Sequence, residues 1–318
     1  MKRLIVTDQA FGNTEQEAAV AAAEKAEFRQ YQCTTEAETA DAVAGADVVM
    51  NNFAPMTHRV MKSMARGAVI IRYGVGVDNV DLSAAKELGV SVCNVPDYGV
   101  EEVADHAAAI ALSLRRRLGH FDEAVREGRW GVASIASHLP SLRDTVVGLL
   151  GFGRIARAFA ERMQAFGCRI IAFDPYVAAD VAEATGVEMA TREDVIRNAH
   201  ILSLHVPLTK ETRHVIDAAA IAMMQRGAIL INASRGGLID ESALADALAT
   251  GQLSAAGLDV FEQEPPPAGS PLRYAPNLLM TPHAAFYSDA SVKALQRLAA
   301  EEAGRALRGE PLRCALKL

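Results

Sequence analysis

Short apolar runs alternate with helix-like segments along the whole chain, which has 318 residues. We interpret ten of these runs as β-strands, at residues 3–7, 47–51, 68–72, 90–93, 146–150, 170–173, 201–204, 228–232, 256–258 and 278–280. Continuous apolar strands separated by helices are typical of parallel sheets that are covered on both faces. The pattern therefore predicts an α/β fold built from doubly wound parallel sheets.

The clearest predicted helix covers residues 101–117. Its apolar side chains recur at intervals of three and four residues, which places them on one helical face. They are Val103, Ala107, Ile110 and Leu114. A turn-rich tetrad, PDYG at residues 96–99, precedes this helix, and residues 15–27 and 218–224 have the composition of further helices. Because the long helix separates two groups of strands, we expect it to connect two doubly wound halves.

Length, charge and cysteine usage narrow the class of protein. A chain of this length exceeds what one hydrophobic core usually covers, so we expect two domains. The net charge of −7, without a basic block, argues against binding to nucleic acid. The apolar stretch at residues 107–114 is too short to span a bilayer, and residues 1–7 lead directly into a strand, so we expect neither a membrane span nor a signal peptide. Four scattered cysteines without a CxxC pair indicate reduced thiols in a cytoplasmic protein without a metal site.

A glycine-rich turn follows the predicted strand at residues 146–150. In the segment VVGLLGFGRIA, Gly151 would allow a tight turn, and Gly153 would let the backbone approach a pyrophosphate at a helix N-terminus. The next predicted strand ends at Asp174, where an acid suits the 2′-hydroxyl of an adenosine ribose and would repel a 2′-phosphate. The pattern thus favours NAD over NADP. The alternative is a structural glycine turn followed by a surface aspartate.

Three side chains with complementary chemistry follow predicted strands in the last third of the chain: Arg235, Glu264 and His283. Because the carboxyl ends of parallel strands meet at one edge of a sheet, we expect the three near one cleft. An imidazole paired with a carboxylate exchanges a proton near neutral pH, and a guanidinium can bind a carboxylate through two parallel hydrogen bonds. With a nicotinamide, these groups would oxidise or reduce a 2-hydroxy/2-oxo acid. Another histidine, His106, lies inside the long helix, where we favour a structural role.

Several long motifs are specific enough to indicate a family. They are IRYGVGVDNVDL (71–82), VPDYGVEEVADHAAAIAL (95–112), VGLLGFGRIA (147–156), HVPLTKETRHVI (205–216), NASRGGLIDESALADAL (232–248) and GLDVFEQEP (257–265). With these motifs the chain resembles the D-isomer-specific 2-hydroxyacid dehydrogenase family over essentially its full length. The segment TPHAAFYSD (281–289) is most similar to the branch that contains the C-terminal-binding protein corepressors, in which a Trp usually occupies the position of Phe286.

The resemblance implies a set of site residues. His283 would be the general acid/base, Glu264 would orient its ring and favour the imidazolium, and Arg235 would bind the substrate carboxylate. Further substrate contacts would come from Arg72, the backbone amides of Val75 and Gly76, and Phe286. NAD would be bound by Gly151, Gly153, Arg154, Ile155, Asp174, Val206, Pro207, Thr212, Ala233, Arg235, Asp259 and His283.

The resemblance also implies a discontinuous architecture. Residues 99–285 would form a Rossmann NAD-binding domain that is inserted in a flavodoxin-like substrate domain, made of residues 1–98 and 286–318. The surroundings of the helix at residues 101–117 would form a homodimer interface, and hinges near Gly99 and after His283 would let the cleft close.

These expectations describe an NAD-dependent D-2-hydroxyacid dehydrogenase, or 2-oxoacid reductase, that acts on a small-molecule acid. Two alternatives remain open, an NAD(H)-sensing corepressor-like binding protein and a D-3-phosphoglycerate dehydrogenase. A phosphate would need cations, and the loop at residues 51–55 supplies none, although His58 and Arg59 follow it closely.

Overall fold

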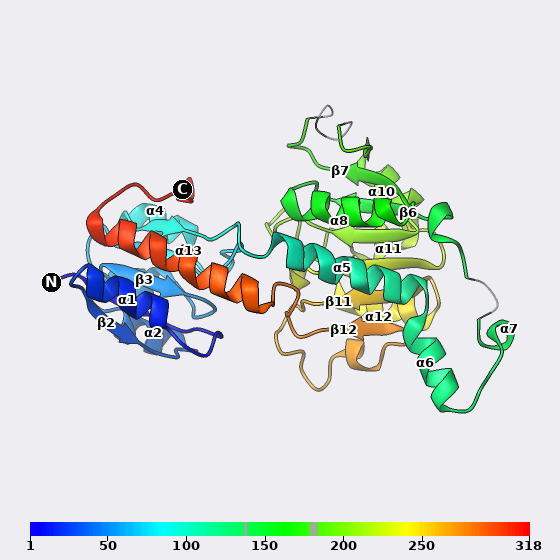
Figure 1. The fold of residues 1–318 in the computed structure, drawn as a ribbon, viewed down its shortest axis with the longest axis horizontal. Helices are drawn as coiled ribbons and strands as arrows, with labels where there is room; N and C mark the ends of the chain where they lie inside the picture. The colour runs from blue at the N-terminus through cyan, green and yellow to red at the C-terminus, as the bar shows by residue number, and fades with distance from the viewer. Residues whose placement is uncertain (137–138, 179–180, 182–183) are drawn as a thin grey trace. The chain divides into compact units, whose positions relative to one another are not determined.

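The structure is a computed structural model, and it describes residues 1–136, 139–178, 181 and 184–318. The chain separates into two compact units (Figure 1). Unit 1 consists of Met1–Gly99 and Tyr287–Leu318, and unit 2 consists of Val100–Phe286. The chain therefore enters unit 2 after Gly99 and leaves it after Phe286. Each unit is described separately below.

Unit 1 contains a five-stranded sheet in which all strands are parallel, in the order β2-β1-β3-β4-β5. The strands are β1 (Arg3–Val6), β2 (Glu27–Gln30), β3 (Val48–Asn51), β4 (Val69–Arg72) and β5 (Ser91–Cys93). The helices are α1 (Glu15–Ala23), α2 (Glu36–Ala42), α3 (His58–Ser63), α4 (Leu82–Leu88) and α13 (Asp289–Arg308). This strand order is that of the flavodoxin-like fold.

Different helices cover the two faces of the sheet of unit 1. Helices α1 and α13 lie side by side and pack against Leu4 and Val6 (Figure 1). Helices α2, α3 and α4 pack on the opposite face, against Ile5 and Val49. Consecutive residues of β1 thus face opposite cores, as the alternation of side chains along a strand requires.

Elements α1, β2 and α13 of unit 1 differ from the sequence-based expectation. The helix predicted over residues 15–27 ends at Ala23, because Lys25 adopts a left-handed conformation (φ +53°) and residues 27–30 form β2. Strand β2 has the polar sequence EFRQ and lies half-exposed at the sheet edge, so it has no apolar run to reveal it. The longest helix, α13, is missing from the predicted helices, although its buried Leu295, Leu298 and Ala299 recur at helical intervals.

Unit 2 contains a seven-stranded sheet, also entirely parallel, in the order β12-β11-β10-β9-β6-β7-β8. The strands are β6 (Val146–Leu150), β7 (Arg169–Phe173), β8 (Glu188–Met189), β9 (Ile201–Leu204), β10 (Ala228–Asn232), β11 (Leu253–Leu258) and β12 (Leu278–Met280). Six of them have the strand order of the Rossmann fold, with β12 added at one edge. The expected α/β fold with two doubly wound parallel sheets is therefore confirmed.

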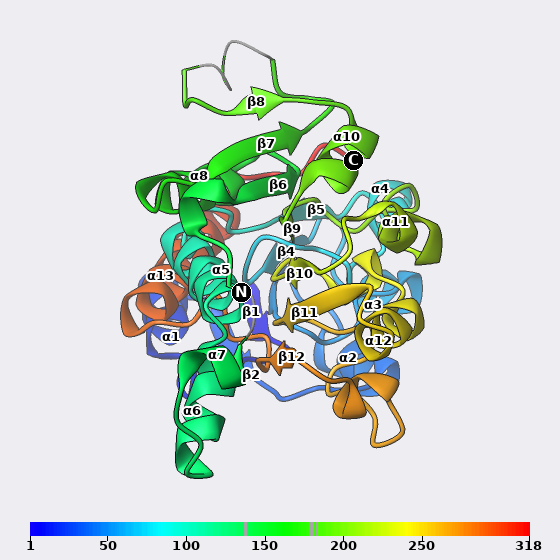
Figure 2. The same cartoon turned by 90° about the vertical axis from the view of Figure 1, so that its right-hand side faces the viewer.

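The helices of unit 2 also form two layers. They are α5 (Val100–Arg115), α6 (Leu118–Arg126), α7 (Val132–Ile135), α8 (Arg154–Ala165), α10 (Arg192–Asn198), α11 (Ala218–Met223) and α12 (Glu241–Ala249), with 3-10 turns η1 (Leu142–Asp144), η2 (Gly236–Leu238) and η3 (Pro271–Tyr274). Helices α5 and α8 cover one face of the sheet, and α10, α11 and α12 cover the other (Figure 2). Within the described residues, no helix combines the length and apolarity needed to cross a bilayer.

Unit 2 differs from the sequence-based expectation at α5, β11 and β8. Helix α5 stops at Arg115, two residues before the predicted end, and Arg117 is left-handed (φ +52°). Strand β11 begins at Leu253 rather than at residue 256, and β8 is a two-residue edge strand that the sequence pattern does not predict. A Cβ at Gly257 would lie 2.1 Å from Ile110 Cγ2, so helix α5 packs directly on β11. Helix α5 therefore supports β11, the strand that leads into the candidate active site.

Candidate active site

The loops that carry the three predicted catalytic side chains leave neighbouring strands of unit 2. Arg235 follows β10, Glu264 lies in the loop after β11, and His283 follows β12. These three strands are adjacent and parallel, so their carboxyl ends lie at the same edge of the sheet. All three side chains therefore belong to unit 2.

His283 and Glu264 form a direct imidazole–carboxylate pair. His283 Nδ1 lies 2.7 Å from Glu264 Oε2, and the side chains are 29% and 34% exposed. The other carboxylate oxygen, Oε1, accepts a hydrogen bond from the Phe261 backbone N–H at 3.0 Å. Burial acts to raise the pKa of Glu264, but the hydrogen bond and charge of His283 outweigh it, and the pKa is lowered. Glu264 is thus suited to accept the Nδ1 proton of His283.

The backbone around His283 is held by a buried carboxylate. His283 adopts a left-handed conformation (φ +54°), and its N–H donates to the backbone oxygen of Asp259 at 2.7 Å. The side chain of Asp259 is completely buried, and it accepts hydrogen bonds from the backbone N–H groups of Ala284 and Ala285, both at 2.8 Å. Asp259, predicted as a contact of the nicotinamide, therefore also fixes the turn that presents His283.

The loop that carries Arg235 is fixed from both sides. The buried Asn232 side chain donates to the carbonyl of Arg235 at 2.7 Å and accepts from the Ser234 N–H at 3.0 Å. A Cβ at Gly236 would lie 1.9 Å from the carbonyl carbon of Phe261, so only glycine allows this loop to contact the loop of Glu264. The charge of Arg235 is close enough to help lower the pKa of Glu264, after the larger effects named above.

Phe286 completes this group of side chains within unit 2. Its ring packs edge-on against the imidazole of His283, with the ring centroids 6.5 Å apart. An aromatic wall beside the imidazole can exclude water from one side of His283. The structure therefore brings together Arg235, Glu264, His283, Phe286 and Asp259, as the sequence motifs predict.

The glycine turn at the end of β6 meets the loop after β9. Gly151 has φ +90°, and a Cβ there would lie 2.5 Å from the carbonyl oxygen of His205, so this position requires glycine. Gly153 is the N-cap of the 12-residue helix α8, and a Cβ there would meet no atom within 4 Å. Open space in front of a helix N-terminus, with the amides of Arg154 and Ile155 at its first turn, fits the pyrophosphate of a dinucleotide.

Asp174 directly follows β7, and its carboxylate holds the backbone of two segments, the glycine turn and the loop after β7. Its Oδ2 accepts from the Phe152 N–H and its Oδ1 accepts from the Tyr176 N–H, both at 2.8 Å. A carboxylate has about four acceptor positions, so Asp174 retains capacity for a ribose hydroxyl. Asp174 can therefore support the glycine turn and bind a ribose hydroxyl at the same time.

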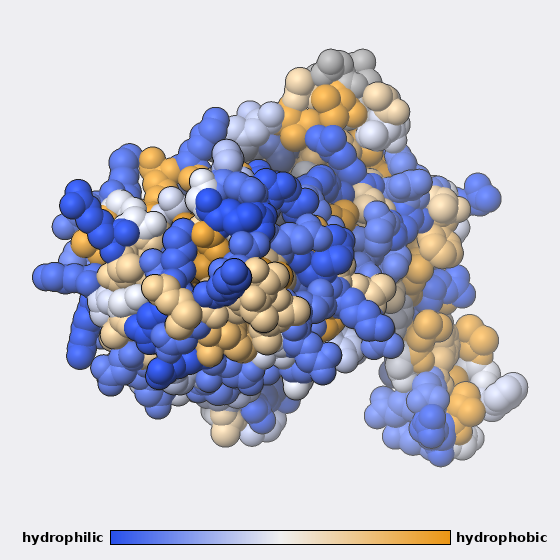
Figure 3. Space-filling model, turned by 60° about the vertical axis from the view of Figure 1, so that its left-hand side comes forward, coloured by the Kyte–Doolittle hydropathy of each residue, from blue (hydrophilic) through white to orange (hydrophobic). Residues whose placement is uncertain are grey.

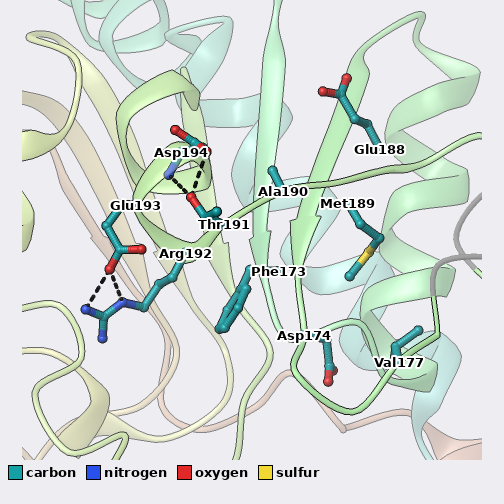
Figure 4. A pocket seen from close by; sticks show the side chains of 10 residues that line it. All are labelled: Phe173, Asp174, Val177, Glu188, Met189, Ala190, Thr191, Arg192, Glu193 and Asp194. Atoms are coloured by element: carbon teal, nitrogen blue, oxygen red, sulfur yellow. Dashed lines mark hydrogen bonds and ion pairs between the residues drawn. The ribbon is translucent and has the colours of Figure 1, made fainter.

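Asp174 lines a pocket of about 890 Å³ beside β7, β8 and the start of α10 (Figure 4). The lining includes Phe173, Met189 and Arg192, none of which the sequence analysis assigns to the cofactor site. Arg192 Nη2 lies 3.0 Å from Glu193 Oε1, so its charge is balanced by a neighbouring carboxylate (Figure 4). The lining combines the apolar side chains of Phe173, Val177, Met189 and Ala190 with the acids Asp174, Glu188, Glu193 and Asp194.

The loop after β9 carries the predicted cofactor residues Val206, Pro207 and Thr212. Thr212 Oγ1 donates to the Pro207 carbonyl at 2.7 Å and closes a turn, and Val206 packs near Gly151. His205 is the first residue after β9. Its Nε2 lies 2.9 Å from Ser203 Oγ, and burial lowers the pKa of the ring to about 4. Ala233 follows β10 directly.

The predicted substrate contacts of unit 1 lie at the end of β4. Arg72 is the last residue of this strand, and its guanidinium carbon lies 6.0 Å from the ring centroid of Phe53. Gly74 has φ +116°, and a Cβ there would lie 2.1 Å from Arg72 Nη1. Val75 is 44% exposed, and its carbonyl accepts a hydrogen bond from the Asn94 side chain at 2.7 Å. The loop of Val75 and Gly76 is thus a glycine-rich backbone segment beside one arginine, a suitable environment for a carboxylate.

Comparison with known proteins identifies the family. Residues 108–285 match the model of the D-isomer-specific 2-hydroxyacid dehydrogenase NAD-binding domain. The chain is 38% identical to D-3-phosphoglycerate dehydrogenase of Methanocaldococcus jannaschii over 278 residues, which cover 87% of this chain and 52% of that protein. It spans about half the length of the curated relatives it matches.

Solved structures extend the similarity to nearly the whole chain. The TT0316 protein of Thermus thermophilus has a TM-score of 0.87 and 31% identity, with 99% of this chain and 100% of that chain covered. D-lactate dehydrogenase of Aquifex aeolicus, solved with NAD and lactic acid, has a TM-score of 0.86 and 26% identity, with 97% and 96% covered. Since the family model covers more than half of the chain, the protein belongs to the D-isomer-specific 2-hydroxyacid dehydrogenase family of NAD-dependent oxidoreductases acting on CH–OH groups, and unit 2 carries its NAD-binding domain.

Proposed function

We propose that the protein is an NAD-dependent D-2-hydroxyacid dehydrogenase that interconverts a small 2-hydroxy acid and its 2-oxo acid. The observation that carries this proposal is the His283–Glu264 pair, with 2.7 Å between Nδ1 and Oε2, at the carboxyl edge of a Rossmann sheet. A positioned imidazole with one nitrogen occupied by a carboxylate is the arrangement used for general acid/base catalysis.

The bound cofactor supplies or accepts the hydride at C2 of the substrate. In reduction, Nε2 of His283 donates a proton to the oxygen of the 2-oxo group, and in oxidation it takes the hydroxyl proton. Glu264 holds Nδ1 of the same ring, so the imidazole keeps its orientation while its charge changes. Arg235 binds the substrate carboxylate and polarises the carbonyl that is reduced.

The two units have different roles in this proposal. Unit 1 is the substrate domain, in which the backbone amides of Val75 and Gly76, with Arg72, contact the substrate. Phe286 forms an apolar wall beside His283. Unit 2 binds NAD: the amides of Arg154 and Ile155 hold the pyrophosphate and Asp174 holds the adenosine ribose. Val206, Pro207 and Thr212 line the adenosine, and Ala233 and Asp259 hold the nicotinamide end.

The second candidate substrate is 3-phosphoglycerate, because the relative from Methanocaldococcus jannaschii carries the name D-3-phosphoglycerate dehydrogenase. The contacts of unit 1 favour an acid without phosphate. His58 lies 3.6 Å from Glu87 and Arg59 lies 3.8 Å from Glu36, so both cations near the loop at residues 51–55 already face carboxylates. Asn51 and Asn52 are almost completely buried and do not offer their side chains to a ligand.

The third candidate function, an NAD(H)-sensing corepressor-like protein, rests on the similarity of TPHAAFYSD alone. The relatives named above are dehydrogenases or unnamed by activity, and they add no support for that branch. A binding protein of this kind would have a partner whose affinity depends on NADH, and a pull-down with and without NADH distinguishes it from the enzyme.

We also propose that the chain forms a homodimer through the surroundings of α5. The adjoining helices α6 and α7 expose apolar side chains, visible on the projection at the lower right of Figure 3. Trp130 is 86%, Val132 67%, Leu118 56% and Val125 52% exposed. Such an apolar cluster on a largely hydrophilic surface is typical of an interface. Sedimentation equilibrium of the wild type and of Trp130→Ser measures the contribution of this surface.

The proposed activity is tested by NADH oxidation with a panel of 2-oxo acids, including glyoxylate, hydroxypyruvate and branched or thioether acids. The same panel with NADPH measures the selectivity that Asp174 is expected to impose. Oxidation of 3-phosphoglycerate by NAD, measured alongside, decides between the two substrate candidates. Absence of turnover with every acid would reject the dehydrogenase proposal.

A further inference from the structure

A chain of side-chain hydrogen bonds lies behind the turn that presents His283. His106 Nε2, on α5, lies 3.0 Å from Thr281 Oγ1, and Thr281 Oγ1 lies 2.5 Å from Asp259 Oδ1. We propose that His106 and Thr281 are positioning residues, which fix the buried Asp259 carboxylate and through it the orientation of His283. This inference rests on the proposed role of His283 and adds two residues to it.

The direction of the hydrogen bonds follows from the chemistry of the groups. The ionised carboxylate of Asp259 can only accept, so the hydroxyl proton of Thr281 points to Asp259 Oδ1. The Thr281 oxygen then accepts from His106, which requires the proton of the His106 ring to be on Nε2. The same nitrogen lies 3.6 Å from Asp259 Oδ1, so the imidazole faces both members of the chain.

Asp259 transmits this arrangement to His283 through three backbone contacts. Its backbone oxygen accepts from the His283 N–H at 2.7 Å, and its carboxylate accepts from the next two N–H groups, of Ala284 and Ala285. A carboxylate that rotated would lose contacts on the C-terminal side of His283. The left-handed backbone of His283 (φ +54°) is costly for a residue with a side chain, so it depends on these contacts.

The two ends of the chain of hydrogen bonds are anchored in rigid elements. His106 lies one helical turn before Ile110, which packs directly against Gly257 of β11, and Asp259 follows β11 immediately. Thr281 follows β12, which pairs with β11 in register. Small displacements of a catalytic group reduce rates strongly, so a rigid support behind His283 has a direct functional consequence.

The network also connects the two segments through which the chain enters and leaves unit 2. Helix α5 begins where the chain enters unit 2, and residues 281–286 end where it leaves. Both segments are therefore tied to the same buried carboxylate. Neither His106 nor Thr281 has an expected contact with substrate, and both act through Asp259.

Two matched pairs of variants test the proposal in the full-length protein. Thr281→Val removes the hydroxyl at nearly constant volume, whereas Thr281→Ser retains it. His106→Leu removes the ring donor, whereas His106→Gln retains an N–H at the position of Nε2. The measurements are kcat and KM with the best acid of the panel, the thermal midpoint of unfolding, and the low-field proton NMR signal of the His283–Glu264 hydrogen bond, assigned by its loss in Glu264→Gln.

We expect Thr281→Val and His106→Leu to lower kcat about 10-fold, with a much smaller change in KM. The low-field signal should move or broaden in both, and the serine and glutamine variants should restore kcat and the signal. If the valine variant folds and keeps the wild-type kcat and signal, the proposal is wrong. An equal loss in both members of each pair, in proportion to the loss of thermal stability, would also contradict it, because a merely structural role predicts that result.

The two levels of inference fail in distinguishable ways. A wild-type protein without turnover on any 2-oxo acid rejects the proposed function. The NMR signal is read without turnover, so it still decides whether the hydroxyl of Thr281 and the ring of His106 hold His283 against Glu264.

Discussion

Two hydrogen-bonded imidazole–carboxylate pairs in the described part of unit 2 look alike and differ in their surroundings. His283 pairs with Glu264 at 2.7 Å, and His214 pairs with Glu262 at 2.5 Å. Both histidines have a left-handed backbone, with φ +54° and φ +50°, and the side chains of both pairs are about one-third exposed. The pair alone therefore does not identify the catalytic histidine.

The supporting contacts separate the two pairs. Glu262 is shared with Arg213, whose Nη2 lies 3.2 Å from the same Oε1, so its charge is divided between two exposed partners. The His214 N–H donates to the carbonyl of Gly237, a loop contact at 2.9 Å. His283 instead has the buried Asp259 behind its turn. Because the buried Asp259 fixes the turn of His283, we interpret the His283 pair as the reactive one and the His214 pair as a loop contact.

The largest expected effect comes from removing each imidazole in turn. We expect His283→Ala to lower kcat/KM about 10³-fold, because the general acid/base is lost, an effect of about 4 kcal/mol on the activation barrier. His214→Ala should change kcat/KM less than about twofold, within the range of a surface substitution. Steady-state NADH oxidation measures both, and thermal unfolding confirms that both variants are folded. Equal losses in the two variants would contradict the distinction drawn here.

The next largest effect concerns the two carboxylates of the same loop. Glu264→Gln should lower kcat about 10²-fold, because the imidazole loses the partner that orients it and stabilises its charge. Glu262→Gln is the matched control, since it makes the same change two residues away, and it should retain nearly full activity. A larger loss in the Glu262 variant would show that the second pair is the reactive one.

The lowered pKa of Glu264 gives this comparison a pH dependence with a definite sign. Because the folded-state pKa lies below the unfolded value, the pair contributes stability that is fully present above the ordinary pKa of glutamate, about 4.3. That contribution is lost as pH falls through the lowered pKa. The difference in free energy of unfolding between wild type and Glu264→Gln should therefore decrease as the pH falls below about 4.3. A difference that grows as the pH falls through that acid range would contradict the sign.

Much of this fold follows from local sequence pattern, and the exceptions have physical reasons. The apolar runs of β1, β3, β4, β6, β7, β9 and β10 predict buried parallel strands, because both faces of each strand are covered. Strand β2 was not predicted because its polar residues lie at a half-exposed edge. Strand β8 was not predicted because two residues are too few to show a periodicity. The pattern of hydrophobic residues reveals buried strands, and an edge strand is only partly buried.

The sequence was enough to choose the candidate catalytic residues, but it did not reveal the contacts that hold them in place. Arg235, Glu264 and His283 could be found because each follows an apolar strand and belongs to a long motif. The contact of Gly236 with Phe261, and the hydrogen bonds from Thr281 and Ala284 to Asp259, join segments that only the folded sheet brings together. Glu262 and Glu264 lie two residues apart in the same motif, and local spacing alone does not distinguish them.

The smallest expected effect comes from a third imidazole of unit 2, which has no carboxylate partner. His205 lies against Ser203 and the ring of Phe159, and burial lowers its pKa to about 4. The unfolded chain takes up a proton at the ordinary histidine pKa of about 6.5, whereas the folded protein does not until about pH 4. Stability is thus fully present above pH 6.5 and falls as the pH decreases toward 4.

Between about pH 7.5 and about pH 5 this single group should cost about 2 kcal/mol of unfolding free energy. The measurement is the free energy of unfolding, obtained by urea denaturation of wild type and of His205→Gln at several pH values across that range. The change with pH is then compared between the two proteins, so that the contributions of all other titrating groups cancel. The glutamine variant should lack this part of the slope. If the two slopes are equal, His205 is protonated in the folded state, and an imidazole in this sheet does not need a carboxylate to hold a charge, which would also weaken the role assigned to Glu264.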